Sequence, residues 1–288
     1  MRHLGVLGSP IAHSLSPTIQ LAAFHELGLD WSYEAIEVRE GELESFVRSC
    51  DSTWQGLSLT MPLKAEAISA CDEVDLLALQ VNAANTITWT ASKTHAHNTD
   101  VLGFFNALEL HEAIMIESVT ILGGGATARA AVAAVSKFAA NITVYVRNPS
   151  REESLFQAKG DGHSTLQIAR WDQVQAGLKE PLVISTTPRG VTDVFAHLVP
   201  QTPGILFESL YAPWPTALVS QWERNGGRVL SGLDLLVEQG IEQLKLFVPK
   251  IDLPDVSKIR RVMLDAGRVE LARRNSIALV DVHSKDIQ

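Results

Sequence analysis

Short apolar segments alternate with longer helical segments along most of this 288-residue chain. Short apolar runs between turn residues are typical of buried strands, and longer segments with apolar residues on one face are typical of helices. Regular strand–helix alternation indicates parallel or mostly parallel sheets that are covered by helices on both faces. The chain is therefore predicted to be an α/β protein.

The expected elements fall into two groups. The expected strands cover residues 4–7, 33–38, 56–59, 85–89, 119–122, 142–146, 182–186, 205–208 and 228–230. The expected helices cover residues 17–27, 43–48, 62–70, 101–110, 126–139, 233–247 and 256–275. The pattern restarts at Ser118, and the C-terminal helices have no strand between them. We therefore expect two α/β domains: a discontinuous one of residues 1–100 and 233–288 with a mainly parallel sheet, and one of residues 101–232.

Composition and charge exclude several classes of protein. With 46% apolar and 20% charged residues, the chain has enough apolar surface to fold, which excludes a disordered protein. A net charge of -9 disfavours binding to nucleic acid, because an acidic chain repels phosphate backbones. Cys50 and Cys71 form neither a disulfide framework nor a zinc motif and fit a reducing compartment. No apolar run approaches the ~20 residues of a membrane span, and the N-terminal run is too short for a signal peptide. We therefore expect a cytoplasmic protein.

A glycine-rich loop follows the expected strand 119–122. Its pattern is G-x-G-x-x-A, with Gly123, Gly125 and Ala128 at the defining positions and an Ala-rich helix after them. The first glycine permits a tight turn, the second lets a pyrophosphate approach the backbone, and the alanine lets the helix pack closely on the strand. The N-terminus of the helix then offers free N–H groups to phosphates. The loop predicts a dinucleotide site, and a tight turn without a ligand is the alternative.

The next expected strand ends in arginines where NAD-binding proteins usually have a carboxylate. Arg147, Asn148 and Arg151 follow this strand at 142–146, and no Asp or Glu lies among residues 146–151. An acidic residue at this position accepts the ribose 2′-hydroxyl of NAD, whereas guanidinium groups bind a 2′-phosphate through paired hydrogen bonds. The segment therefore favours NADP, unless both arginines are simply solvated on the surface.

Polar residues cluster after the expected strands of the first half. The clusters are residues 8–17, 56–64, 85–86 and 97–100. Ligands of open α/β sheets bind beyond the carboxyl ends of strands. Hydroxyl groups, an amide, a lysine and an aspartate in that position suit a small polyhydroxylated carboxylic acid.

Each cluster also has a purely structural interpretation. Ser16 before Pro17 is a good helix N-cap, Lys64 suits a helix surface, and residues 98–100 suit the cap of the next helix. His95 and His97, together with Asp100, lack a spacing that defines metal geometry, so no metal site is predicted.

The ordered set of motifs resembles the shikimate dehydrogenase family. A single motif is only modestly specific, but the complete order is highly specific and spans about residues 3 to 266. The matching segments are residues 8–17, 56–64, 84–86, 98–100, 123–128, 147–151, 186–190, 211–216 and 232–239.

This resemblance implies a fold, an activity and a set of site residues. The implied activity is the reversible NADPH-dependent reduction of 3-dehydroshikimate to shikimate, in the biosynthesis of chorismate and aromatic amino acids. The implied fold places a cleft between a substrate-binding domain and a Rossmann-like NADP-binding domain. Lys64 and Asp100 would form the catalytic pair. The implied substrate-binding residues are Ser14, Ser16, Thr60, Asn85, Tyr211 and Gln239. The implied cofactor-binding residues are Gly123, Gly124, Gly125, Ala126, Thr127, Arg147, Asn148, Arg151, Ser209 and Gly232.

The chain departs from the family pattern at several positions without losing the Lys64–Asp100 pair. Ser58 stands where an asparagine is usual, close to the expected substrate pocket, which leaves fine substrate specificity open. The other departures are Gln20, Leu21, Ala126, Val146, Ser185 and Glu208. Residues 267–288 form an additional tail without an assigned role. Its basic residues are interpreted as a solvated helix face: Arg268, Arg273 and Arg274.

Two alternative functions stay open at this point. An NAD-using quinate/shikimate dehydrogenase would need an acid after the second strand of the nucleotide-binding unit, and Arg147 argues against it. A nucleotide-binding paralogue without catalysis is disfavoured because Lys64 and Asp100 are both present. The sequence leaves open whether Lys64 transfers a proton or mainly orients the substrate. We expect small-molecule partners and a monomer or homodimer.

Overall fold

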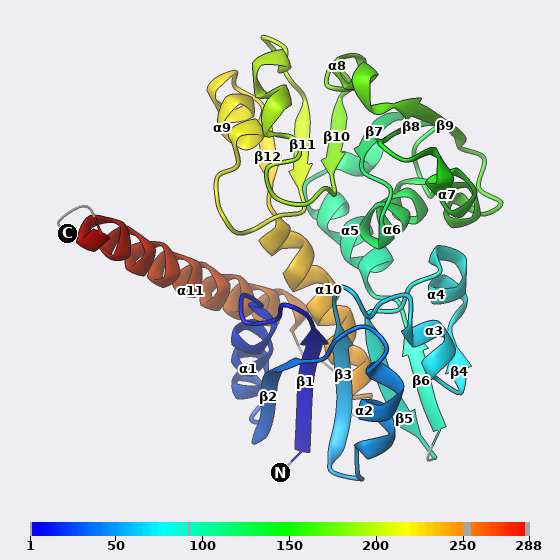
Figure 1. Ribbon diagram of the computed structural model, residues 1–288, viewed down its shortest axis with the longest axis vertical. Coiled ribbons are helices and arrows are strands. Elements are labelled where there is room, and N and C mark those ends of the chain that lie inside the picture. The colour runs from blue at the N-terminus through cyan, green and yellow to red at the C-terminus, as the bar shows by residue number, and fades with distance from the viewer. Residues whose placement is uncertain (1, 92, 250–254, 286–288) are drawn as a thin grey trace.

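Two sheets, each with helices on both faces, make up the protein in the computed structural model (Figure 1). The structure describes residues 2–91, 93–249 and 255–285, and residues 277–285 by their backbone alone. One sheet lies above the other in Figure 1, and helices α5 (Asp100–Leu110) and α10 (Gly232–Phe247) run between them. The predicted α/β class with two sheet-based units is confirmed.

The first sheet is mixed and has the strand order β2-β1-β3-β5-β6-β4. Its strands are β1 (Arg2–Gly8), β2 (Trp31–Glu37), β3 (Trp54–Leu59), β4 (Glu73–Val74), β5 (Thr86–Thr90) and β6 (Lys93–His97). Parallel pairings join β1 to β2 and β3, and β4 to β6. Strand β5 is antiparallel to both of its neighbours. Strand β6 was not predicted, because its sequence KTHAH is mostly polar and lacks the apolar run of a buried strand.

The second sheet is entirely parallel, with the order β12-β11-β10-β7-β8-β9. Its strands are β7 (Ser118–Leu122), β8 (Asn141–Val146), β9 (Thr165–Arg170), β10 (Leu182–Ser185), β11 (Ile205–Glu208) and β12 (Arg228–Leu230). This is the doubly wound order, and the chain reverses direction across the sheet between β7 and β10. A ligand is expected in the crevice at the carboxyl ends of those two strands.

The helices predicted from the sequence are found in position but not always in length, and the helices at residues 76–81, 152–159, 174–177 and 217–224 were not predicted. The remaining α-helices are α1 (Ser16–Glu26), α2 (Leu43–Ser49), α3 (Ala67–Ala70), α4 (Leu76–Val81), α6 (Ala126–Val135), α7 (Glu152–Lys159), α8 (Val174–Gly177), α9 (Ala217–Arg224) and α11 (Val256–Lys285). The 3-10 helices are η1 (Ala113–Met115), η2 (Pro149–Arg151), η3 (Trp171–Gln173) and η4 (Asp193–Leu198). The helix predicted over 62–70 is wrong for its first half. The Lys64 carbonyl accepts the Ala84 N–H at 2.7 Å, so a tertiary bond replaces the helical one.

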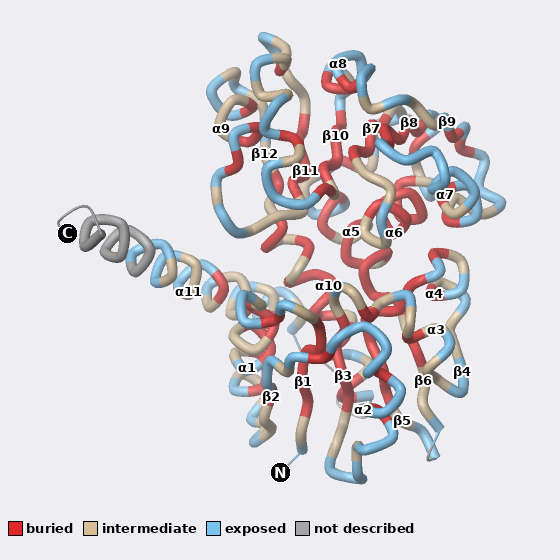
Figure 2. The backbone as a smooth tube through the Cα atoms, in the orientation of Figure 1, coloured by how far each residue is buried: buried red, intermediate tan, exposed pale blue. Residues whose placement is uncertain are grey.

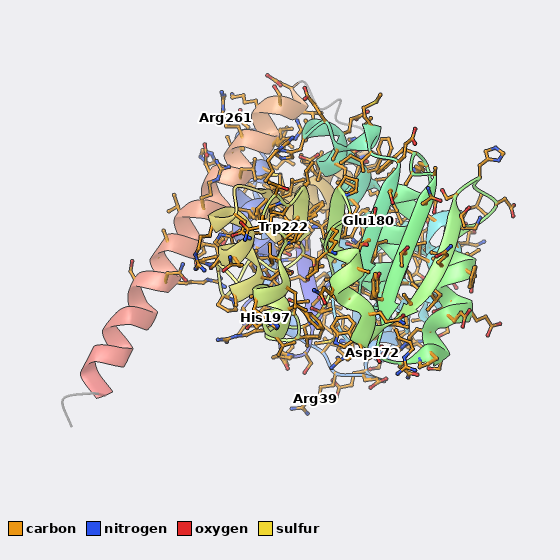
Figure 3. The ribbon with its side chains drawn as sticks, turned by 90° about the horizontal axis from the view of Figure 1, so that it is seen from above. Arg39, Asp172, Glu180, His197, Trp222 and Arg261 are labelled. Carbon is orange, nitrogen blue, oxygen red and sulfur yellow. The ribbon has the colours of Figure 1, made fainter. Side chains whose placement is uncertain are left out.

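Alternating side chains of each strand point to opposite faces of its sheet, and each face has its own core. Val6 packs with residues of α1, α10 and α11, whereas its neighbour Leu7 packs with α2, α3 and α4. In the second sheet, Ile121 faces α5 and α6, and Leu122 faces α8 and α9. Figure 2 shows buried residues along the inner strands of both sheets and along α10. Trp222 of α9, labelled in Figure 3, is fully buried and donates its indole N–H to the Gly204 carbonyl at 3.0 Å.

Helices α5 and α10 cross closely at a glycine. A Cβ atom added to Gly103 would lie 2.7 Å from the Gln239 Cβ and 2.9 Å from the Gln239 backbone nitrogen. Because these contacts are to a backbone and to the first atom of a side chain, neither can move away easily. We expect Gly103→Ala to lower the free energy of unfolding by about 1–3 kcal/mol, the usual cost of overpacking. Urea unfolding of the purified variant measures this change.

Gly240→Ala is the matched control for this prediction. Gly240 also lies within a helix, but its added Cβ would first meet the terminal methyl of Met263 at 3.1 Å, which is the far end of a flexible side chain. We expect a change below about 1 kcal/mol, because the helix preference of alanine offsets the tight contact. Equal losses in both variants would contradict the close crossing at Gly103.

Candidate active site

A cavity of about 320 Å³ lies between the two sheets, at the carboxyl ends of their central strands. Loops after β1 and β3 form one wall, and loops after β10 and β11 form the opposite wall. All eight predicted catalytic and substrate residues line it: Ser14, Ser16, Thr60, Lys64, Asn85, Asp100, Tyr211 and Gln239. Three predicted cofactor residues also line it: Thr127, Ser209 and Gly232.

The predicted catalytic pair is formed in the structure. Lys64 Nζ lies 2.6 Å from Asp100 Oδ2, and the side chains are 18% and 8% exposed. Lys64 lies in the turn after β3, and Asp100 is the first residue of α5. Asp100 Oδ1 accepts a hydrogen bond from Asn85 Nδ2 at 2.9 Å. Both carboxylate oxygens are therefore held, and the ammonium group is directed by a fixed partner.

Asn85 organises the base of the cavity. It is buried, and its Nδ2 also lies within hydrogen-bonding distance of Thr99 Oγ1, at 2.9 Å, and of Gln239 Oε1, at 3.1 Å, so its two N–H groups are shared among these oxygens and Asp100. Its Oδ1 accepts the Thr99 N–H at 2.8 Å. The amide therefore joins β5, the start of α5 and α10 in one network. Asn85 thus orients Asp100 in addition to lining the cavity.

The purely structural interpretations of the polar clusters are wrong for some residues and hold in part for others. Helix α1 starts at Ser16 itself and has no side-chain cap, so the N-cap interpretation of Ser16 is wrong. The Ser16 N–H instead donates to Ser14 Oγ at 3.2 Å, and Ser16 is 6% exposed. The cap interpretation of residues 98–100 holds only in part: the N-cap of α5 is Thr99, which has no side-chain cap bond, and Asn98 before it accepts the Val101 N–H on its Oδ1 at 3.1 Å. Lys64 is not a surface lysine, because Asp100 and the cavity enclose it.

A second network of polar side chains lies behind the loops after β1 and β3. This network was not predicted. The Tyr33 hydroxyl donates to Ser58 Oγ at 2.6 Å, and the Ser58 hydroxyl donates to Gln243 Oε1 at 2.9 Å. Gln243 Nε2 in turn donates to the Asn85 carbonyl at 3.1 Å. Burial raises the pKa of the Tyr33 hydroxyl, so it stays protonated as a donor. The spacing of four residues from Gln239 to Gln243 puts both amides on one face of α10, and this signal was available in the sequence.

The glycine loop has the backbone shape that a dinucleotide requires. Gly123 has φ +120, and an added Cβ there would lie 2.5 Å from Thr186 Oγ1. An added Cβ at Gly124 would lie 3.1 Å from the Cβ of Arg151. Helix α6 begins directly after Gly125 without a side-chain cap, so the first N–H groups of the helix have no intrahelical acceptor. The loop and its arginine therefore fit a pyrophosphate and its nucleotide.

The predicted 2′-phosphate residues lie at the outer end of this loop. Arg147 and Arg151 are both exposed, and the Arg147 guanidinium lies over the Trp171 ring at 5.9 Å. Asn148 Oδ1 accepts the Ser150 N–H at 3.0 Å and caps η2. The predicted cofactor residues outside the central cavity are Gly123, Gly124, Gly125, Ala126, Arg147, Asn148 and Arg151. The predicted cofactor residues inside and outside the cavity together extend from the cavity to the end of β8.

Glu208 is a buried carboxyl at the end of β11. It is 0% exposed, its Oε1 accepts the Leu210 N–H at 3.2 Å, and its Oε2 has no hydrogen-bond partner. Burial raises the pKa of Glu208 to about 7, against the opposing effect of the hydrogen bond from the Leu210 N–H. Ser209 and Tyr211 follow in the same turn, so this carboxyl supports residues that line the cavity.

The raised pKa of Glu208 predicts a pH-dependent loss of stability. The folded pKa of about 7 exceeds the ordinary 4.5, so the contribution is complete below about pH 4.5 and is lost as pH rises through 7. Glu208→Gln cannot ionise and should flatten this loss, which is on the order of 3 kcal/mol at about 1.36 kcal/mol per pKa unit. Thermal melts from about pH 5 to pH 8 measure the difference. Glu223→Gln, at an exposed position on α9, is the control and should follow the wild type.

The histidines and cysteines outside the cavity form no metal centre in the part of the chain that the structure describes. The rings of His95 and His97 stack and lie 3.3 Å from carboxylates of Glu73 and Asp75 respectively. Cys50 and Cys71 are free thiols, and burial raises the pKa of each to about 11. Among the described residues, no helix has the length and apolar character to cross a membrane.

Comparison with known proteins identifies the family. A profile of the shikimate dehydrogenase substrate binding domain matches residues 6–87. Shikimate dehydrogenase (NADP(+)) of Pyrococcus abyssi is 33% identical over 270 residues, which cover 92% of this chain and 98% of the relative. The chain belongs to the shikimate dehydrogenase family. The shikimate dehydrogenase (NADP(+)) of Trichormus variabilis is 32% identical and covers 87% of this chain and 92% of its own length.

Solved shikimate dehydrogenases share the fold. The crystal structure from Mycobacterium tuberculosis has a TM-score of 0.84 at 33% identity and covers 93% of this chain and 100% of its own. A Thermus thermophilus structure in complex with NADP(H) and shikimate has a TM-score of 0.80 at 28% identity, covering 92% of this chain and 100% of its own. The predicted arrangement of a substrate unit and a Rossmann-like unit is therefore confirmed.

Proposed function

We propose that this protein is an NADP-dependent shikimate dehydrogenase, which reversibly reduces 3-dehydroshikimate to shikimate in aromatic amino-acid biosynthesis. The observation that carries this proposal is the buried Lys64–Asp100 pair, 2.6 Å apart, in a cavity shared with Thr127 of the glycine-loop helix. Membership of the shikimate dehydrogenase family supports it, because the matching relatives carry the name shikimate dehydrogenase (NADP(+)).

The substrate is proposed to lie against the first sheet. Ser14 and Ser16 offer hydroxyl donors for its carboxylate, and Tyr211 lies on the opposite wall. The ring hydroxyls would meet the remaining polar side chains, which are Thr60, Asn85 and Gln239. Hydrogen bonds to buried polar groups discriminate strongly against a molecule that lacks the matching hydroxyl. This lining therefore suits a small, polyhydroxylated acid.

The cofactor is proposed to lie along the second sheet. NADPH supplies the hydride for the substrate carbonyl when it is bound there. Residues 123–127 would hold its pyrophosphate on backbone N–H groups, and Arg147 and Arg151 its 2′-phosphate. The nicotinamide end would lie among Ser209, Gly232 and the residues after β10, where both units face the cavity.

Lys64 is proposed to act on the oxygen of the reacting carbon. As the C3 carbonyl is reduced, its oxygen gains negative charge and needs a proton, which the ammonium group is placed to donate. Asp100 holds that group in position through the 2.6 Å contact. Asn85 in turn holds Asp100, so the Lys64 ammonium group has little rotational freedom. In the reverse direction, the same lysine accepts the hydroxyl proton.

The proposed substrate and cofactor sites also divide the chain into two domains. We propose residues 1–100 and 233–288 as the substrate domain and residues 101–232 as the cofactor domain. The two separate sheets support this division, and the core around α5 and α6 joins the units, because Val81, Ala83 and Leu235 of the substrate domain pack into it. The two free thiols support a cytoplasmic location, because reducing compartments keep cysteines unpaired.

The test of the proposed function is nicotinamide absorbance with two substrate–cofactor pairs. Purified protein should reduce NADP⁺ on addition of shikimate, and should do so with much higher kcat/KM than it reduces NAD⁺ on addition of quinate. A preference for quinate and NAD⁺ would establish the alternative dehydrogenase. The absence of turnover with either pair would contradict a catalytic role for this chain.

A further inference from the structure

Helix α11 runs beside α1 and then projects beyond the body of the protein (Figure 1). It packs along α1, the helix that starts at Ser16. Seen from above in Figure 3, α11 extends away from the body, and Arg261 lies near its beginning. The basic residues of this helix were interpreted as a solvated face. That interpretation is wrong for Arg274, whose side chain is 31% exposed and contacts the substrate loop.

Arg274 holds the loop that carries Ser14. Its Nη1 donates to the His13 carbonyl at 2.7 Å, and its Nη2 donates to the Ser14 carbonyl at 3.3 Å. Both loop residues line the 320 Å³ cavity. The planar guanidinium therefore fixes two consecutive carbonyl groups at once, which a lysine could not do with the same geometry. The adjacent Ser16 N–H is bonded to Ser14 Oγ, so the fixed loop continues into α1.

The cluster around Arg274 carries a net positive charge. Glu270 accepts hydrogen bonds from Arg273 and from Arg274, each at 2.7 Å. The two guanidinium groups lower the pKa of Glu270 to about 2, so it stays ionised at neutral pH. Two positive groups and one negative group leave a charge of +1 beside the loop. Inside the cavity, by contrast, the charge of Lys64 is balanced by Asp100.

Tyr211 lines the cavity on the side opposite the Ser14 loop. Burial raises the pKa of the Tyr211 hydroxyl, while a hydrogen bond with the Leu15 backbone and the charge of Arg274 oppose that rise. The hydrogen bonds of Arg274 to the His13 and Ser14 carbonyl groups therefore place its charge beside one wall of the cavity.

We infer that Arg274 is a positioning residue for the carboxylate of the substrate. It keeps the Ser14 loop in its binding shape and adds an uncompensated positive charge behind it. This inference rests on the proposed function, because it takes shikimate as the ligand. It extends that function to the C-terminal helix, which contributes a side chain outside the motifs recognised in the sequence.

Steady-state kinetics and calorimetry of two arginine variants test the inference. Arg274→Ala should raise KM and Kd for shikimate about 5- to 20-fold, while kcat and KM for NADP⁺ change less than about twofold. Arg274→Lys keeps the charge and loses the paired geometry, so it should recover part of this loss. Added salt should narrow the gap between Arg274→Ala and wild type, because the Debye length falls to about 3 Å at 1 M.

Arg273→Ala is the matched control. Arg273 belongs to the same helix and pairs with the same Glu270, but makes no contact with the substrate loop. Arg273→Ala removes the same unit of charge from the cluster but keeps the loop contact. Because the Arg273 side chain is 60% exposed and its charge is screened by water, KM for shikimate should stay within about twofold of wild type. Methyl shikimate, which lacks the anionic carboxylate, is the matched ligand. Its KM should differ less between wild type and Arg274→Ala than the KM of shikimate does.

The failures of the two proposals are distinguishable. If the wild type does not oxidise shikimate with NADP⁺, the proposed function is wrong. If the wild type is active and Arg274→Ala has the same KM and Kd for shikimate as Arg273→Ala, the inference about Arg274 is wrong. A fall in kcat with unchanged KM would also overturn it. If Arg274→Ala does not fold, Arg274→Lys against Arg273→Lys gives the same comparison.

Discussion

Lys64→Ala should lower kcat by about 10²–10⁴-fold, the usual effect of losing a group that transfers a proton in the transition state. KM for shikimate should change much less, because the hydroxyl and amide groups that line the cavity are unaffected. Initial rates of NADPH formation, with saturating NADP⁺ and varied shikimate, measure both parameters. The melting temperature of the variant shows whether the fold is intact.

Asp100→Asn extends this prediction to the partner of Lys64. It should also lower kcat strongly, because Asp100 directs the ammonium group through the 2.6 Å contact. Lys64→Ala combined with Asp100→Asn should lower kcat far less than the product of the single effects, since the two residues act as one unit. Lys93→Ala is the control, because Lys93 pairs with Glu73 at an exposed site. A Lys64→Ala enzyme with near-native kcat would rule out the catalytic role.

Replacing both Arg147 and Arg151 by alanine should remove most of the preference for NADP⁺. Each charge-assisted hydrogen bond to a phosphate contributes about 1.5–3 kcal/mol, which corresponds to roughly 10–150-fold in affinity per arginine. Both side chains are exposed, so we expect the lower end of this range. KM for NADP⁺ should rise strongly and depend less on salt, while KM for NAD⁺ should change little, because NAD⁺ has no 2′-phosphate.

Arg170→Ala is the control for this pair. Arg170 lies at the end of the neighbouring strand β9, but its guanidinium is engaged by Asp172 at 2.8 Å. It should leave the KM for NADP⁺ nearly unchanged. Lysine at positions 147 and 151 should recover part of the preference. Equal losses for both cofactors in the double alanine variant would mean that the arginines support the fold or the pyrophosphate instead.

The resemblance to the family identified Lys64 and Asp100 as the catalytic pair, whereas the residues alone placed them only in polar clusters beside predicted elements. Asp100 follows β6, a strand that was not predicted, so the structure showed how the first sheet brings the two residues to one edge. Gln243 and Tyr33 were missed, because their roles depend on the packing of α10 and β2 against Ser58. Such contacts join residues far apart in the chain, and their local sign is the four-residue spacing from Gln239 to Gln243 on one face of α10.

Arg274 illustrates the same limit most clearly. Its sequence context, with Arg268 and Arg273 nearby, is that of a charged helix surface. Only the packing of α11 along α1 brings its guanidinium to the carbonyl groups of His13 and Ser14. The length of α11 was also underestimated, since the sequence predicted its end at residue 275 and the helix continues to Lys285.

By itself, the sequence determined the alternation of strands and helices, the glycine loop and the polar residues at the strand ends. These features follow from side-chain periodicity, from the conformations open to glycine and from local capping, which act over a few residues. The tertiary structure decided the antiparallel β5–β6 pairing, the tertiary bond from Ala84 that replaces the first half of the helix predicted over 62–70, and the contact of Arg274 with the substrate loop. The reason is that each of these depends on a hydrogen bond between segments that meet only once both cores are packed.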